Sequence, residues 1–276
     1  MQPKHTVALA THRENHVRSI SENSSDRNFI ASLARGLAVM QVFSERKRQL
    51  TVSQISAHTG ISRAAVRRSL LTLVKLGYAA TQDEQHYFLC PKVLSLGQSY
   101  FSSTLIAKFA QPILEQLSGE LYESCSIATL DQYEVFYVAR AAVSRIMSID
   151  LRVGSRLPAF CTSMGRVLLA HLSAARLGKY LAHVPLTRYT NKTVDSTAKL
   201  RQILDTVRRT EYAIVDQELE VGLRSLAVPI RNTSGEVVAA LNVGCHAQRV
   251  TIREMQSTFL PHLRKAAAEI GTKLKE

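Results

Sequence analysis

The sequence predicts an α+β protein of two domains, and three observations lead to this prediction. The chain has 276 residues, 46% of them hydrophobic, which is enough for two packed cores. The N-terminal third contains two short capped helices followed by a pair of short strands. The remainder mixes turn-linked strands with amphipathic helices, as is typical of helices packed on an antiparallel sheet.

The chain is predicted to begin with a disordered tail and a first helix. Residues 1–28 are polar and lack periodicity. The first helix is predicted from apolar residues that recur every three or four positions: Ile30, Leu33, Leu37 and Met40. This helix opens a domain that we place at residues 29–90.

Two capped helices follow, joined by a turn of about four residues. The first is predicted to begin at Thr51, which forms a capping box with Gln54, and to end at Gly60. The second is predicted to begin at Ser62 and to end at Gly77. Its apolar stripe consists of Val66, Leu70 and Leu73. This spacing predicts a helix-turn-helix.

A wing and a linker helix are predicted next. Residues 78–89 form two short strands around the polar turn 82–85, which is a candidate wing. Pro91 suits the first position of a helix, so residues 91–103 are predicted to form a linker helix that could also pack on a second subunit.

Residues 104–276 are predicted to form the larger domain. We expect its helices at 105–123, interrupted or kinked at Pro112, at 162–172, 173–183 and 197–210, and from about 251 onward. We expect its strands at 125–130, 135–141, 145–151, 212–216, 226–231 and 237–243.

The charge of the chain indicates a polyanionic partner. The net charge is +13, and residues 27–90 contain nine Lys and Arg against three acidic residues. The second helix of the helix-turn-helix carries polar and basic positions off its apolar stripe. These candidate contacts to double-stranded operator DNA are Ser62, Arg63, Ala64, Arg67 and Arg68. The alternative is an ordinary helical domain with a solvated basic face.

Several classes of protein are disfavoured. No segment approaches the roughly 18 apolar residues of a membrane span, and the N-terminus does not resemble a signal peptide. The four cysteines are widely spaced, so we predict neither a metal site nor a disulfide framework and expect a reducing cytoplasm. We expect no cofactor.

A candidate site for a small carboxylate lies at the start of the helix predicted after Thr162. With Thr162 as the N-cap, backbone N–H groups of Met164 and Gly165 would lack partners within the helix. Ser163 adds a hydroxyl, and Arg166 either adds a positive charge or is an exposed helix residue.

Residues 29–89 resemble the winged helix-turn-helix of the IclR regulators, above all in TGISRAAVRRSLLTLVKLGY at 59–78. The resemblance continues in the same order through VGSRLPAFCTSMGRVLLA at 153–170, VDQELEVGLRSLAVPI at 215–230 and AALNVGC at 239–245. It is greatest to the PcaR, PcaU and PobR branch, which regulates protocatechuate, 4-hydroxybenzoate and β-ketoadipate catabolism.

The resemblance implies a GAF-like effector domain, homodimers that can associate to tetramers, and control of a nearby catabolic operon. It favours activation of transcription over repression. It implies an effector of the protocatechuate, 4-hydroxybenzoate or β-ketoadipate type. Effector contacts carry over to Ser163, Met164, Ser225, Asn242 and Gly244. Family members often have serine at the last two positions, where this chain differs.

Alternatives remain open at the sequence level. One of Asp216, Glu218 and Glu220 could orient a ligand hydroxyl or an arginine, or they could be surface charges or a structural pair with Arg224. An enzyme acting on a small carboxylic acid is a second class, although the sequence contains no familiar catalytic motif. An architectural DNA-binding protein is a third, and it leaves the C-terminal two-thirds without a role.

Overall fold

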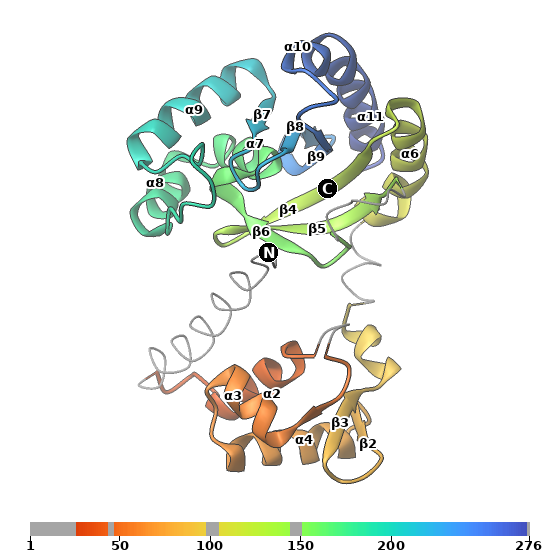
Figure 1. Ribbon diagram of the computed structural model, residues 1–276, viewed down its shortest axis with the longest axis vertical. Helices are drawn as coiled ribbons and strands as arrows, with labels where there is room; N and C mark the ends of the chain where they lie inside the picture. The colour runs from red at the N-terminus through yellow and green to blue at the C-terminus, as the bar shows by residue number, and fades with distance from the viewer. Residues whose placement is uncertain (1–25, 44–46, 98–104, 144–150, 275–276) are drawn as a thin grey trace. The chain divides into compact units, whose positions relative to one another are not determined.

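The computed structural model describes residues 26–43, 47–97, 105–143 and 151–274. The chain divides into two compact units, residues 1–100 and 101–276 (Figure 1). Most of the tail predicted at 1–28 lies outside the described residues, and the domain boundaries predicted at 90 and 104 stay predictions.

The N-terminal unit is a three-helix assembly with a small sheet. Its elements are α2 Ala31–Gln41, β1 Leu50–Thr51, α3 Val52–Thr59, α4 Arg63–Lys75, β2 Ala79–Thr81, β3 His86–Leu89 and the 3₁₀ turn η1 Pro91–Val93. The strands form an antiparallel sheet in the order β1-β3-β2. Residues 94–97 continue as α-helix, and the rest of the predicted linker helix lies outside the described residues.

The helix-turn-helix has the caps that the sequence predicts. Thr51 and Gln54 form a reciprocal capping box at the start of α3. Gly60 ends α3 in the left-handed region, with φ of 72°. Ser62 then caps α4 by accepting a hydrogen bond from the Ala65 N–H. Val66, Leu70 and Leu73 are buried against α2 and α3.

Of the apolar stripe predicted for the first helix, only Met40 packs against the core of its unit. Ala38 and Val39 are the buried residues of this helix. Ile30, Leu33 and Leu37, by contrast, are 63%, 60% and 49% exposed. The periodicity predicted the helix correctly, but Ile30, Leu33 and Leu37 form an apolar surface that none of the described residues covers.

The C-terminal unit contains a six-stranded antiparallel sheet in the order β6-β5-β4-β9-β8-β7. The strands are β4 Ser124–Asp131, β5 Glu134–Ala141, β6 Arg156–Pro158, β7 Ala213–Asp216, β8 Leu223–Arg231 and β9 Val237–His246. The helices are α6 Leu105–Leu121, η2 Ala159–Cys161, α7 Ser163–Ala170, α8 Ala174–His183, α9 Thr197–Thr210, α10 Ile252–Glu254, the π-helical η3 Met255–Phe259 and α11 Leu260–Thr272.

Each face of the sheet covers one core cluster (Figure 1). The helices α6 and α11 pack on one face, around residues such as Leu114, Leu241 and Leu263. The helix α7 packs on the other face, with α8 and α9 outside it. We call these the α11 face and the α7 face. The α+β prediction is confirmed.

Two predicted helices differ from the observed ones, and one predicted strand lies almost wholly outside the described residues. The helix α6 runs through Pro112 without interruption. The strand predicted at 145–151 falls almost wholly on residues outside the described part, whereas the short edge strand β6 was not predicted. The terminal helix begins at the predicted Thr251 cap but contains a π-helical turn before α11.

Candidate functional site

The exposed side of α4 is a candidate DNA interface. Arg63, Ala64, Arg67 and Arg68 are all exposed, while the opposite side of the helix forms the core of the unit. Among the described residues, none of the three arginines forms an ion pair. A basic helix whose charges are not neutralised internally can offer them to phosphates and base edges.

Ser62 differs from the other predicted DNA contacts because its hydroxyl already caps α4, with 3.4 Å between Oγ and the Ala65 nitrogen.

The tip of the candidate wing is acidic rather than basic. It carries the exposed acids Asp83 and Glu84. The hydrogen bond with the His86 side chain lowers the Asp83 pKa to about 2, so this carboxylate is ionised at neutral pH.

The start of α7 has the cap that the sequence predicts. Thr162 Oγ1 accepts a hydrogen bond from the Gly165 N–H at 3.2 Å. A Cβ on Gly165 would lie 2.1 Å from the Ala159 carbonyl oxygen, so only glycine lets the helix approach the preceding turn this closely. Ser163 and Met164 are both 1% exposed, which places the helix start inside the unit.

Two polar contacts fix the direction of α7 over the sheet. His171, just after the helix, lies 3.1 Å from the Glu211 carboxylate, which precedes β7. Arg166, near the helix start, contacts Glu218, which follows β7, at 2.7 Å. The start of α7 therefore lies at the end of the sheet where β7 and β9 finish and β8 begins.

Strand register brings three further predicted effector residues to this end and to the α7 face. Ser225 is directly opposite Gly244, and Ala227 is directly opposite Asn242. Ala227 belongs to the core cluster under α7. Side chains two positions apart on a strand, or directly opposed on neighbouring strands, share a face. Ser225, Asn242 and Gly244 therefore lie on the α7 face.

Two buried polar atoms in this region lack partners. Ser163 Oγ and Asn242 Oδ1 find no hydrogen-bond partner among the described residues. Leaving a buried polar atom without a hydrogen bond lowers the stability of the folded protein by about 1–3 kcal/mol relative to a hydrogen-bonded one. Beside them, a Cβ built on Gly244 would meet nothing within 4 Å. The α7 face thus combines unsatisfied polar atoms with open space, as a site for a small polar ligand requires.

Arg166 is neither an exposed helix residue nor an available positive charge. Its side chain is 3% exposed and donates to the Glu218 carboxylate and to the Phe160 carbonyl oxygen at 3.0 Å. Glu218 also accepts a hydrogen bond from the Val194 N–H at 3.1 Å. The pair holds the turn before α7 against the loop after β7, which is a structural role.

Asp216 does not join the other predicted effector residues. It is opposite Arg224, which in turn is opposite Cys245 of the α11-face cluster, so it lies on the other side of the sheet. Its carboxylate binds Arg224 at 2.7 Å and Lys192 at 2.8 Å. Burial raises the Asp216 pKa, but the hydrogen bonds from Arg224 and Lys192 outweigh burial and hold it at about 2. Asp216 is the structural partner of Arg224.

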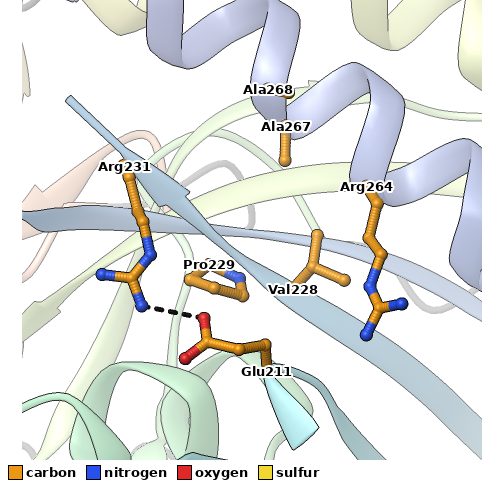
Figure 2. A pocket seen from close by; sticks show the side chains of 7 residues that line it. All are labelled: Glu211, Val228, Pro229, Arg231, Arg264, Ala267 and Ala268. Carbon is orange, nitrogen blue, oxygen red and sulfur yellow. Dashed lines mark hydrogen bonds and ion pairs between the residues drawn. The ribbon is translucent and has the colours of Figure 1, made fainter. Parts of the chain in front are cut away.

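A pocket of about 270 Å³ lies elsewhere, on the α11 face (Figure 2). Its lining residues are Glu211, Val228, Pro229, Arg231, Arg264, Ala267 and Ala268. Figure 2 shows the Glu211 carboxylate bound to Arg231, at 2.8 Å. Burial raises the Glu211 pKa, but hydrogen bonds from Arg231 and His171 outweigh it and lower the pKa. None of the buried partnerless atoms belongs to this pocket, so it is a weaker candidate than the α7 face.

Three of the four cysteines are buried and unreactive. Burial raises the pKa of Cys125, Cys161 and Cys245 to about 12 each, so these thiols stay protonated at neutral pH. The described residues contain no group of three or more His, Cys, Asp and Glu side chains placed to hold a metal ion. Within the same residues, no helix is both long and apolar enough to cross a membrane.

Comparison with known proteins identifies both units. Residues 32–83 match the IclR helix-turn-helix domain, and residues 98–272 match the C-terminal domain of bacterial transcriptional regulators of the IclR type. The Pca regulon regulatory protein of Pseudomonas putida is 50% identical over 92% of this chain and 87% of its own length. The p-hydroxybenzoate hydroxylase transcriptional activator of Acinetobacter baylyi is 37% identical over 91% of this chain and 94% of its own.

Solved structures agree with this assignment. A transcriptional regulator from Rhodococcus sp. RHA1 is 44% identical, with a TM-score of 0.78 over 89% of this chain and 98% of its own. An IclR homolog from Microbacterium hydrocarbonoxydans, solved with 4-hydroxybenzoate, is 26% identical, with a TM-score of 0.77 over 88% and 98%. These relatives are regulators rather than enzymes, which overturns the enzymatic alternative. The chain belongs to the IclR family of DNA-binding transcriptional regulators.

Proposed function

We propose that this regulator controls genes for the breakdown of aromatic acids, and that its signal is a small aromatic acid or a ring-cleavage product of one. The names of the Pseudomonas and Acinetobacter relatives support the pathway, and the 4-hydroxybenzoate complex of a homolog supports the class of ligand. The observation that carries the effector site is the pair of buried partnerless atoms, Ser163 Oγ and Asn242 Oδ1, beside the open space at Gly244.

The proposed effector site is the α7 face at the start of α7. Its residues are Ser163, Met164, Ser225, Asn242 and Gly244. A thermal-shift screen with protocatechuate, 4-hydroxybenzoate and β-ketoadipate tests the ligand class, because a ligand of the folded state raises the melting temperature. No shift with any of the three acids at millimolar concentration would contradict the proposal.

Two variants test the position of the site. Ser163→Ala removes one hydrogen-bonding group and should weaken binding by about 1 kcal/mol. Met164→Arg inserts a long charged side chain at a position that is 1% exposed, and should abolish binding of the acid. Operator binding in the absence of ligand should persist in both variants. Wild-type affinity of Met164→Arg in a calorimetric titration would place the ligand elsewhere.

The proposed operator contacts are the residues on the exposed side of α4: Ser62, Arg63, Ala64, Arg67 and Arg68. Arg67→Ala and Arg68→Ala should each weaken operator binding by about 1–3 kcal/mol without loss of stability, since both side chains are exposed. Arg253→Ala, an exposed arginine of the other unit, is the matched control. Unchanged operator affinity of both α4 variants in a fluorescence-anisotropy titration would argue against α4 as the recognition helix.

We further propose that the effector turns transcription on, because the Acinetobacter relative is named a transcriptional activator. A reporter fused to the adjacent operon should then respond to the acid only when the regulator is present. Higher reporter output in a strain lacking the regulator would indicate repression instead.

We also propose that the chain binds its operator as a dimer and that such dimers can associate to tetramers. A single recognition helix covers few base pairs, and paired half-sites require two helices. The exposed residues Leu33 and Leu37 of α2, with Ile30 just before it, offer a surface for a second copy. The exposed Leu94 and Leu96 of the segment after the wing offer another.

A further inference from the structure

The sheet under α7 is lined by small side chains around one amide. Asn242 of β9 is directly opposite Ser126 of β4 on one side and Ala227 of β8 on the other. Ala240 and Gly244 lie two positions away along β9, so they share the same face. Ala227 and Ala240 both belong to the core cluster under α7. Among these five residues, Asn242 alone has a long polar side chain.

The Asn242 amide is buried without a partner of its own. The residue is 8% exposed, and its Oδ1 forms no hydrogen bond with any described residue. Ser126, its neighbour on β4, already accepts a hydrogen bond from the Arg140 Nη1 at 2.8 Å. A Cβ built on Gly244 would meet no described atom within 4 Å. Because buried polar atoms normally have a partner, the amide oxygen is available to a bound molecule that fills this space.

The carboxylate of an acidic ligand suits the start of α7 better than it suits Asn242. The Ser163 hydroxyl is buried without a partner, and the N–H groups of Ser163 and Met164, the first two residues of α7, lack partners within the helix. A helix start also attracts negative charge. The Asn242 amide is neutral, and its carbonyl oxygen repels a carboxylate. It is therefore suited to a second, uncharged oxygen of the ligand.

We infer that Asn242 recognises an uncharged oxygen substituent of the effector. The regulator then responds to acids that carry a hydroxyl or keto group in addition to the carboxylate, rather than to acids that lack one. An amide can accept a hydrogen bond from a hydroxyl or donate one to a keto oxygen. The inference rests on the proposed function, since it assigns the specificity-determining residue of the proposed effector site.

The test uses two pairs of acids whose members differ by one oxygen substituent. These pairs are 4-hydroxybenzoate with benzoate, and β-ketoadipate with adipate. In calorimetric titrations, the full-length wild type should bind the oxygenated member of its pair at least ~10-fold more tightly, because the other member leaves the amide unpaired. Asn242→Leu removes the amide but keeps a branched side chain. It should reduce this preference to less than ~3-fold by weakening only the oxygenated acid.

The melting temperature without ligand separates ligand recognition from a structural role. Asn242→Leu and Asn242→Ser remove an amide oxygen that has no hydrogen bond in the chain, so neither should melt much below wild type. Asn242→Ser is smaller than the native residue and Asn242→Leu is larger, so a steric effect cannot explain a fall in both. If both melt more than about 5 °C below wild type, the amide holds the fold together and the inference is overturned.

Two further variants serve as comparisons. Asn191→Leu changes an exposed asparagine of the same unit and should leave every affinity unchanged. Ser225→Ala removes another hydroxyl of the proposed site. Ser225 is expected to contact a part of the ligand that both acids of a pair share, so this variant should weaken both to the same extent. If Ser225→Ala removes the preference and the Asn242 variants keep it, Asn242 does not determine specificity.

The outcomes separate this inference from the proposed function. If the wild type binds both acids of a pair equally, or if Asn242→Leu and Asn242→Ser weaken both equally, the role of Asn242 is overturned while the effector proposal stands. If the wild type binds none of the four acids and no protocatechuate, the proposed effector class and the inference fail together.

Discussion

Two charged side chains of this protein have structural roles that follow from their surroundings rather than from their residue type. Arg166 and Asp216 lie in segments that resemble effector loops, yet each forms an ion pair within the chain. The sequence therefore indicated the two charges, and only the strand register and the long-range contacts showed that both are paired.

The pairing of Asp216 predicts a pH-dependent stability. Its pKa is about 2 in the folded protein, against an ordinary value of 3.8. A depressed pKa means that the ionised carboxylate stabilises the folded state above about pH 4, and that this stabilisation is lost as the pH falls toward 2. Asp216→Asn should therefore be less stable than wild type by a constant amount between pH 5 and 7, with a smaller difference below pH 4.

Urea denaturation at several pH values measures this difference. Asp216→Asn should also keep its affinity for the effector, because Asp216 lies on the α11 face. A loss of effector affinity with unchanged stability would indicate instead that Asp216 contacts the effector.

Among the secondary structure elements, helix starts were the most predictable features. Thr51, Ser62 and Thr162 cap the helices as expected, because capping depends on a hydroxyl and on residues within one turn. The short strand β6 was missed, since three residues ending in proline carry no alternation. The uncovered stripe of α2 shows a second limit: periodicity locates an apolar face but not the partner that covers it.

The five candidate effector residues taken from the resemblance lie together on the α7 face near the start of α7. Arg166, which was considered for its charge, lies there too but is paired with Glu218, and Asp216 lies on the other face of the sheet.

The face on which Arg140 lies could not have been predicted by counting alternate positions. The register of β4 and β5 shifts at a bulge, so Val138 and Ala139 both face the α11 cluster. A simple period of two from Tyr137, which faces α7, would place Arg140 on the opposite side. The bulge returns Arg140 to the α7 face.

The close approach at the start of α7 predicts opposite effects for two helical glycines. Gly165→Ala should destabilise the protein by about 1–3 kcal/mol, because its Cβ would overlap the Ala159 carbonyl oxygen and push the helix away. Gly178→Ala in α8 meets nothing within 4 Å and should stabilise by about 0.5–1 kcal/mol through helix propensity. Thermal and urea denaturation give both values, and equal effects of the two substitutions would show that α7 can shift without cost.

At the scale of the whole molecule, the proposed operator contacts and the proposed effector site belong to separate compact units. The exposed arginines of α4 lie within residues 1–100, and the residues at the start of α7 lie within residues 101–276. A dimer on paired half-sites is part of the proposed function, and the exposed apolar residues of the N-terminal unit are where it can be tested.

The exposed apolar residues Leu33 and Leu37 of α2 allow a test of the proposed dimer on paired half-sites. In the double variant Leu33→Glu and Leu37→Glu, two carboxylates replace apolar side chains that are 60% and 49% exposed in the single chain. Folding should be unaffected, whereas a second copy would have to bury both charges. We expect weaker self-association in analytical ultracentrifugation and a loss of most of the preference for an operator with two half-sites over one.

The matched control is Val221→Glu, which places the same charge at an apolar residue that is 74% exposed in the other unit. It should leave both association and operator preference unchanged. Because the proposed operator contacts on α4 are unchanged in every variant, binding to a single half-site should be the same as in wild type. If the α2 double variant still prefers the paired operator as strongly as wild type does, the second copy must dock elsewhere, and the segment containing Leu94 and Leu96 becomes the next surface to change.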